Sequence, residues 1–112
     1  MKTKELSGAA LDWAVAEAEG VTCAIWQGVV VDEFSNPLMY HDDWALAGAI
    51  IEREKMGLHY GDGTWGVDAG RWEANHPNCL YVEGGATPLE AAMRCYVASC
   101  LGNEVQLPEE LK

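Results

Sequence analysis

The stretch Gly85-Ala86-Thr87-Pro88-Leu89-Glu90-Ala91-Ala92-Met93-Arg94 fixes the start of a helix and is the firmest guide to the fold. Thr87 can cap the first turn, Pro88 fits the first helical position, and Glu90 can reach back as the second member of a capping box. Apolar residues then recur at spacings of three, four and seven until a glycine stops the pattern. These features predict a helix over residues 88–101.

A second helix is expected near the N-terminus. Ser7 begins it, Leu6 and Leu11 can form a hydrophobic staple across its start, and Gly20 ends it. Its apolar face comprises Leu11, Ala14, Val15 and Ala18. Trp13 falls almost opposite this face, so either a second layer covers the ring or the ring faces a ligand or partner.

Between the two helices the sequence changes to strand-forming residues. Residues 21–31 are rich in β-branched and aromatic side chains, with Gly28 expected at a bulge. Residues 32–43 are expected to form a loop, and Ile50-Ile51 is expected to open a short strand or turn.

Further strands are expected in the second half of the chain. Leu58-His59-Tyr60 is predicted to pair with Thr64-Trp65-Gly66-Val67 across a glycine-rich turn. Residues 71–74 and 79–83 supply two more strands, separated by turn-forming residues. The order of helix, antiparallel strands and helix predicts an α+β fold, a small antiparallel sheet with an N-terminal and a C-terminal helix packed on one face. The length of 112 residues suits a single domain over residues 1–112.

The chain is strongly acidic. Asp and Glu outnumber Lys and Arg by 18 to 7, which gives a formal net charge of −11. This charge opposes docking on a phosphate backbone and argues against general nucleic-acid binding. Two explanations for the acidity stay open: solubility, or an acidic face that mimics DNA and occupies the basic cleft of another protein. No apolar run approaches the ~20 residues that span a bilayer, so a soluble cytoplasmic protein without membrane contact is expected.

Cysteines and histidines give no firm metal or redox motif. The four cysteines lack a Cys-x-x-Cys spacing and are interpreted as reduced thiols. His76-Pro77-Asn78-Cys79 could supply two zinc ligands, with His59 or His41 completing a site, but such pairs often arise in loops by chance. We therefore expect no metal and no cofactor.

The sequence holds no recognisable catalytic set. No serine stands in a nucleophile elbow, no His-Glu-x-x-His is present, and Gly61-Asp62-Gly63 is too short to cradle phosphates. A non-enzymatic binding function is therefore expected, with an enzyme acting on a nucleotide as the last-ranked alternative.

Aromatic rings in loop-like places, together with scarce arginines, indicate a binding site. Tryptophan can stack on a nucleobase or anchor a protein interface, and a guanidinium can hold a phosphate or carboxylate. The predicted ligand-binding residues are Tyr40, Asp43, Trp44, Arg53, Arg71 and Trp72. The alternative is that the rings fill a small core and that the arginines pair with neighbouring acids. Trp26 and Trp72 fit this core interpretation better, whereas Trp44 fits a functional one.

Several motifs together resemble a known family. They are the opening stretch of residues 4–16, Asp43-Trp44, Ile50-Ile51-Glu52-Arg53-Glu54, the capped helix start at residues 85–94, and Pro108-Glu109-Glu110-Leu111. As a set they resemble the NinX family of small accessory proteins of lambda-like phages, over nearly the whole chain. The resemblance implies an early phage accessory protein in the host cytoplasm and no defined enzymatic activity.

Two functions follow as hypotheses from the residues and the resemblance. The first is a counter-defence protein that binds and sequesters a nucleotide-type small-molecule signal of the host. The second is an acidic protein–protein inhibitor or DNA mimic directed at a host enzyme. Five tryptophans are many for one small core, so a homo-oligomer is also expected.

Overall fold

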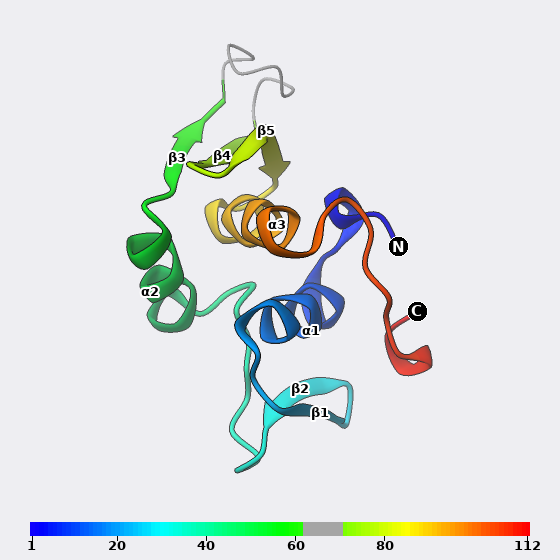
Figure 1. Cartoon of the computed structure of the whole chain (residues 1–112). Coiled ribbons are helices and arrows are strands. Elements are labelled where there is room, and N and C mark those ends of the chain that lie inside the picture. Colours follow the sequence, from blue (N-terminus) through cyan, green and yellow to red (C-terminus); the bar gives the residue numbers. More distant parts are fainter. Residues whose placement is uncertain (62–70) are drawn as a thin grey trace.

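The computed structural model describes residues 1–61 and 71–112, apart from the side chains of residues 79–81 (Figure 1). The helices are α1 (Gly8–Glu19), α2 (Trp44–Glu54) and α3 (Pro88–Leu101), with short 3-10 turns η1 (Thr3–Glu5) and η2 (Glu109–Leu111). The strands are β1 (Cys23–Trp26), β2 (Val29–Asp32), β3 (Gly57–Tyr60), β4 (Trp72–His76) and β5 (Cys79–Gly85).

The C-terminal helix has the predicted bounds, Pro88–Leu101. Thr87 Oγ1 accepts a hydrogen bond from the Glu90 backbone N–H at 3.1 Å, as a cap should. The Glu90 carboxylate accepts from the Ala86 N–H at 3.0 Å, one residue before the cap that the capping box predicts. Both contacts satisfy backbone donors at the helix start, so the local sequence determines where α3 begins.

The N-terminal helix also begins and ends where predicted. Ser7 is its N-cap residue, and Gly20 ends it in the left-handed conformation at φ 71°. Leu6 and Leu11 are fully buried, consistent with the predicted staple. Trp13 is half-buried and packs against the core, so a second layer does cover it.

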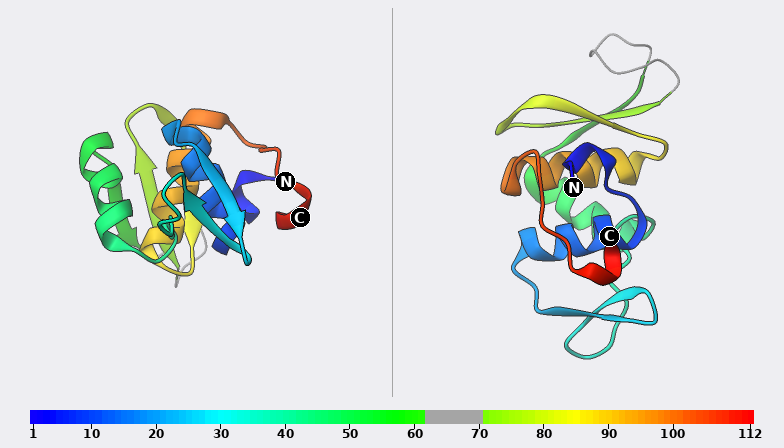
Figure 2. Two further views of the ribbon diagram at one scale, coloured as in Figure 1. Left: turned by 90° about the horizontal axis from the view of Figure 1, so that it is seen from below. Right: turned by 90° about the vertical axis from the view of Figure 1, so that its right-hand side faces the viewer.

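The elements stack in layers (Figure 2). The antiparallel sheet β3-β4-β5 lies against α3, and α1 packs against α3 on the side away from the sheet. The separate hairpin β1-β2 follows α1, while α2 packs beside α3. The α+β class with N-terminal and C-terminal helices is thus confirmed. Both helices lie on one side of the sheet, α3 in direct contact and α1 in the next layer.

The prediction of a short strand or turn at Ile50-Ile51 was wrong, because both residues lie in α2. Asp43 caps this helix by accepting hydrogen bonds from Ala45 N at 2.9 Å and Leu46 N at 3.4 Å. Ile50 is buried in the core, so packing of one helix face outweighs the β preference of adjacent isoleucines. Trp44, predicted in a loop, is the first residue of this helix.

The predicted bulge at Gly28 is instead the tip of the β1-β2 hairpin. Gln27 and Gly28 both have positive φ, 51° and 79°, as a tight two-residue hairpin turn requires. β3 pairs with β4, as shown by the register Leu58–Ala74. The predicted partner segment, residues 64–67, lies outside the described residues. The predicted strands at residues 71–74 and 79–83 correspond to β4 and β5.

Buried Arg94 ties three parts of the fold together. Its Nε donates to Leu6 O at 2.7 Å and its Nη1 donates to Gly84 O at 2.9 Å. Glu90 balances its charge one turn earlier at 3.3 Å. The side chain therefore links α3 to the N-terminal segment and to β5, and burial lowers its pKa from the ordinary value.

Candidate functional site

Trp44 stands at the rim of a hollow where two helices begin. The hollow has a volume of about 160 Å³ and is lined by His41, Asp42, Trp44, Thr87, Pro88 and Leu89. Trp44 and Pro88 are the first residues of α2 and α3, so two helix N-termini meet here. The Trp44 side chain is 57% exposed, which leaves the indole available for stacking.

His41 is held in this hollow by a buried carboxylate. Asp12, on α1, accepts the His41 backbone N–H at 2.9 Å, and its Oδ2 lies 2.7 Å from His41 Nδ1. The Asp12 side chain is 3% exposed and the His41 side chain 28%. Burial raises the pKa of Asp12 to about 6, although the hydrogen bonds from His41 act in the opposite direction.

This contact also fixes the orientation of the imidazole. An ionised carboxylate only accepts, so in the neutral ring the proton lies on Nδ1 and Nε2 carries the lone pair. His41 Nε2 lies 3.7 Å from Asp42 Oδ2, beyond hydrogen-bond distance, and the Asp42 side chain is 59% exposed. The hollow therefore presents two adjacent acceptors, an imidazole nitrogen and a carboxylate, beside an exposed indole.

Two of the predicted ligand-binding residues, Tyr40 and Asp43, stabilise the fold. Tyr40 is only 5% exposed and belongs to the hydrophobic core, so its ring cannot serve as a stacking platform. Asp43 sits next to the hollow, but its carboxylate caps α2. The neighbouring Asp42 is the acid that lines the hollow.

Arg53 does not share a site with Trp44. The two residues lie nine positions apart on α2, about 13 Å along its axis. The Arg53 guanidinium donates to both carboxylate oxygens of Glu19, at 3.0 and 2.7 Å, and to Glu54 at 2.9 Å. It also lies 5.7 Å from the centre of the Tyr96 ring, and the Tyr96 hydroxyl donates to Glu19. Arg53 thus anchors α2 to α1 and α3. This arrangement matches the alternative interpretation, in which the arginines pair with neighbouring acidic residues.

Arg71 and Trp72 lie at the beginning of β4 and do not line the hollow. Trp72 is half-buried and its ring packs edge-to-face on Tyr60, with centroids 5.4 Å apart. This geometry agrees with a core role for Trp72. Of the predicted ligand-binding residues, Trp44 lines the hollow, Asp43 lies next to it, and the other four lie elsewhere.

Sequence reasoning missed the Asp12–His41 pair. The partners are 29 positions apart, one on a helix face and one in a loop, so no local motif joins them. The available signal was an acidic residue beside the apolar face of α1, because a buried acid requires a partner. The sequence pattern around His41 indicates at most a zinc ligand.

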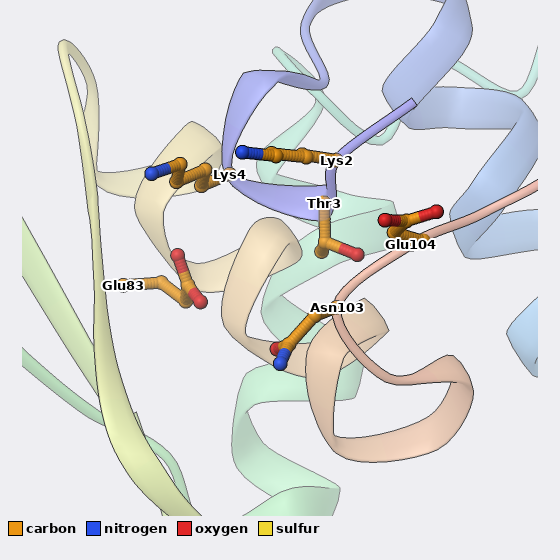
Figure 3. A pocket seen from close by; sticks show the side chains of 6 residues that line it. All are labelled: Lys2, Thr3, Lys4, Glu83, Asn103 and Glu104. Atoms are coloured by element: carbon orange, nitrogen blue, oxygen red, sulfur yellow. The ribbon is translucent and has the colours of Figure 1, made fainter.

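A second, larger hollow forms where the two chain ends meet (Figure 3). It measures about 300 Å³ and is lined by Lys2, Thr3, Lys4, Glu83, Asn103 and Glu104. Figure 3 shows Lys2 and Lys4 side by side, both extending toward the side on which Glu83 lies. The Thr3 hydroxyl donates to Gly102 O at 2.7 Å, so it serves the junction of the termini. None of the described residues that line this hollow is aromatic, so they offer no stacking surface.

The histidine of the proposed zinc pair is otherwise engaged. His76 Nε2 lies 2.9 Å from Glu54 Oε1, and Nδ1 accepts from Asn78 N at 3.0 Å. The side chain of Cys79, the other member of the pair, lies outside the described part of the structure. Among the described side chains, no group of three or more His, Cys, Asp or Glu is arranged to hold a metal ion. None of the described helices is long and apolar enough to span a bilayer.

Comparison with known proteins identifies the family of the chain. No curated protein matches the sequence. The family model described as bacteriophage P22 NinX matches residues 2–100, which is most of the chain. That stretch includes α1, the Asp12–His41 pair, the Trp44 hollow and all but the last residue of α3. The chain therefore belongs to the bacteriophage P22 NinX family.

Proposed function

We propose that this phage protein acts in the host cytoplasm as a non-enzymatic accessory protein that sequesters a nucleotide-type small-molecule signal. The observation that carries the proposal is the exposed Trp44 indole at the rim of a hollow lined by polar groups. Exposing a large ring at the first position of a helix contributes little to folding, whereas a stacked base gains about 1–3 kcal/mol from such a ring.

The size and position of the hollow suit one planar ring of a larger ligand. Its volume of about 160 Å³ is below the roughly 300–1,000 Å³ typical of pockets that enclose whole ligands. One planar ring would occupy it while the rest of the molecule extends outward. The N-termini of α2 and α3 carry partial positive charge, which favours an anionic group nearby despite the net charge of −11.

Thermal-shift measurements against host nucleotides and cyclic dinucleotides test the proposal. A ligand that binds only the folded protein raises the unfolding midpoint by an amount that increases with the logarithm of its concentration relative to its dissociation constant. Trp44→Ala should remove this shift and leave the midpoint of the free protein nearly unchanged. Trp26→Ala is the matched control, because Trp26 is 64% exposed on the β1-β2 hairpin and does not line the hollow.

Mass analysis of the recovered ligand separates sequestration from catalysis. A binding protein returns the ligand unchanged, whereas an enzyme returns a product. Absence of any shift across the nucleotide panel, or equal shifts in Trp44→Ala and the wild type, would contradict the proposal.

A second candidate is an acidic inhibitor of a host protein. It is favoured by Trp26 and Phe34, which are 64% and 76% exposed on the hairpin and the turn that follows it. Exposed aromatic rings anchor protein interfaces, and the surrounding negative charge would attract a basic partner. Capture of a basic host protein that weakens steeply with salt, and that Trp26→Ala abolishes, would support this function.

A further inference from the structure

The acceptors beside Trp44 carry information about which base the hollow can hold. Asp42 Oδ2 and His41 Nε2 are 3.7 Å apart and both line the hollow with the indole. The Asp42 carboxylate makes no hydrogen bond to any other group in the described part of the chain. Its oxygens are therefore open to donors on a ligand.

Asp12 gives the imidazole a fixed role. Its carboxylate lies 2.7 Å from His41 Nδ1 and also accepts the His41 backbone N–H. A ring held at both its backbone and its Nδ1 cannot rotate to present Nδ1–H to the hollow. In the neutral state the group facing a ligand is therefore the Nε2 lone pair, an acceptor.

A ring stacked on Trp44 thus meets two acceptors, His41 Nε2 and the Asp42 carboxylate, at this edge. Thr87 also lines the hollow; its Oγ1 accepts the Glu90 N–H, and its hydroxyl proton can still be donated to a ligand. Matching donors to acceptors selects a base whose edge consists of N–H groups. Guanine has three N–H bonds along one edge, one on N1 and two on the exocyclic N2, whereas adenine alternates a donor with an acceptor.

We propose that the Trp44 hollow selects a guanine-type base, with the Asp42 carboxylate accepting from N1–H and N2–H and His41 Nε2 accepting from N2–H. Asp12 is a positioning residue that fixes the imidazole and does not contact the ligand. This inference rests on the proposed nucleotide binding and adds the class of base. A carboxylate at this edge also disfavours bases that present a carbonyl or ring nitrogen there, because two acceptors would face each other.

Isothermal titration with GMP, IMP and AMP tests the selection. The measurements are made at pH 8. IMP is the sharpest comparison, since it differs from GMP only in lacking the N2 amino group. Wild-type protein should bind GMP about tenfold or more tightly than IMP or AMP, because a matched pair of hydrogen bonds discriminates by roughly that factor or more.

Two variants that each remove one negative charge test whether the preference for GMP comes from Asp42. Asp42→Asn should bring the affinities for GMP and IMP to within about twofold, because an amide presents only one acceptor oxygen. Glu33→Gln removes the same charge from the turn after β2, outside the hollow, and should keep the preference. Free arginine amide, which also presents adjacent N–H donors on a planar group, serves as a competitor and should not displace GMP at equal concentration.

The possible results of these titrations distinguish the selection of guanine from the proposed nucleotide binding on which it rests. Equal binding of the three nucleotides, lost in Trp44→Ala, would overturn base selection and leave the nucleotide site standing. Binding of none of them would overturn both. Displacement by arginine amide would assign the acceptors to a guanidinium group and overturn the choice of a base.

Discussion

Replacing Asp12 by asparagine should change how the stability of the fold depends on pH. Burial raises the pKa of Asp12 from its ordinary value of 3.8 to about 6. Between these two pH values the native state keeps a proton that the unfolded chain has released. The stability that Asp12 contributes is therefore fully present below pH 3.8 and is lost as the pH rises through about 6.

The size of this effect follows from the pKa. A pKa raised from 3.8 to about 6 corresponds to about 3 kcal/mol of unfolding free energy over the whole pH range, at 1.36 kcal/mol per unit. Between pH 5 and pH 7.5 the change amounts to about 1.4 kcal/mol. The amide in Asp12→Asn does not titrate, so the unfolding free energy of wild type minus that of the variant should fall by this amount.

Urea denaturation at several pH values measures the difference directly. Asp32→Asn is a suitable control, because hydrogen bonds from the Asn36 and Phe34 backbone lower the pKa of this exposed carboxylate. Its folded and unfolded pKa values both lie below pH 5, so its difference from wild type should stay constant over the same range. A wild-type-minus-Asp12→Asn difference that is constant or rises with pH would refute the reasoning.

Three further substitutions test the contacts that hold the helices. Thr87→Ala should lower the unfolding free energy by about 1 kcal/mol in urea denaturation by removing the cap of α3; an unchanged midpoint would show that the cap contributes nothing. Val97→Ala should cost about 2 kcal/mol, because Val97 is fully buried and the truncation leaves a void; a smaller loss than in Thr87→Ala would contradict this ranking. Arg53→Lys should cost less than about 1 kcal/mol and the loss should shrink in 1 M salt, because the half-exposed guanidinium loses its two-point contact with Glu19; a large, salt-independent loss would mean that packing on Tyr96 dominates.

Local signals determined which elements could be predicted from the sequence. The cap, the proline and the stop glycine around α3 are short-range features, so both bounds of that helix could be predicted. The signal for α2 was also local, since Asp43 caps it, but adjacent isoleucines suit a strand equally well. Burial of Ile50 against the core decides between the two, and burial depends on the assembled fold.

The candidate site was predictable only in part, for the same reason. Trp44 could be selected because a large ring beside acids in an apparent loop is conspicuous. The orientation of His41 depends on Asp12, which lies on a different element 29 positions away. The roles of adjacent Asp42 and Asp43 could not be told apart from the sequence, since only the helix start shows which carboxylate becomes the cap.

The different roles of Asp42 and Asp43 would allow one short segment to serve both folding and the proposed binding. Asp43 satisfies backbone donors of α2, and Asp12 holds the loop before it through the His41 backbone and ring. These contacts exist without a ligand, so binding need not order the segment, and the entropic cost of association is reduced. What is left exposed, the Trp44 ring and the Asp42 carboxylate, contributes little to stability and can be used for recognition. A segment already held by such contacts, with two groups left exposed, is what the proposed binding of a small ring by few contacts would require.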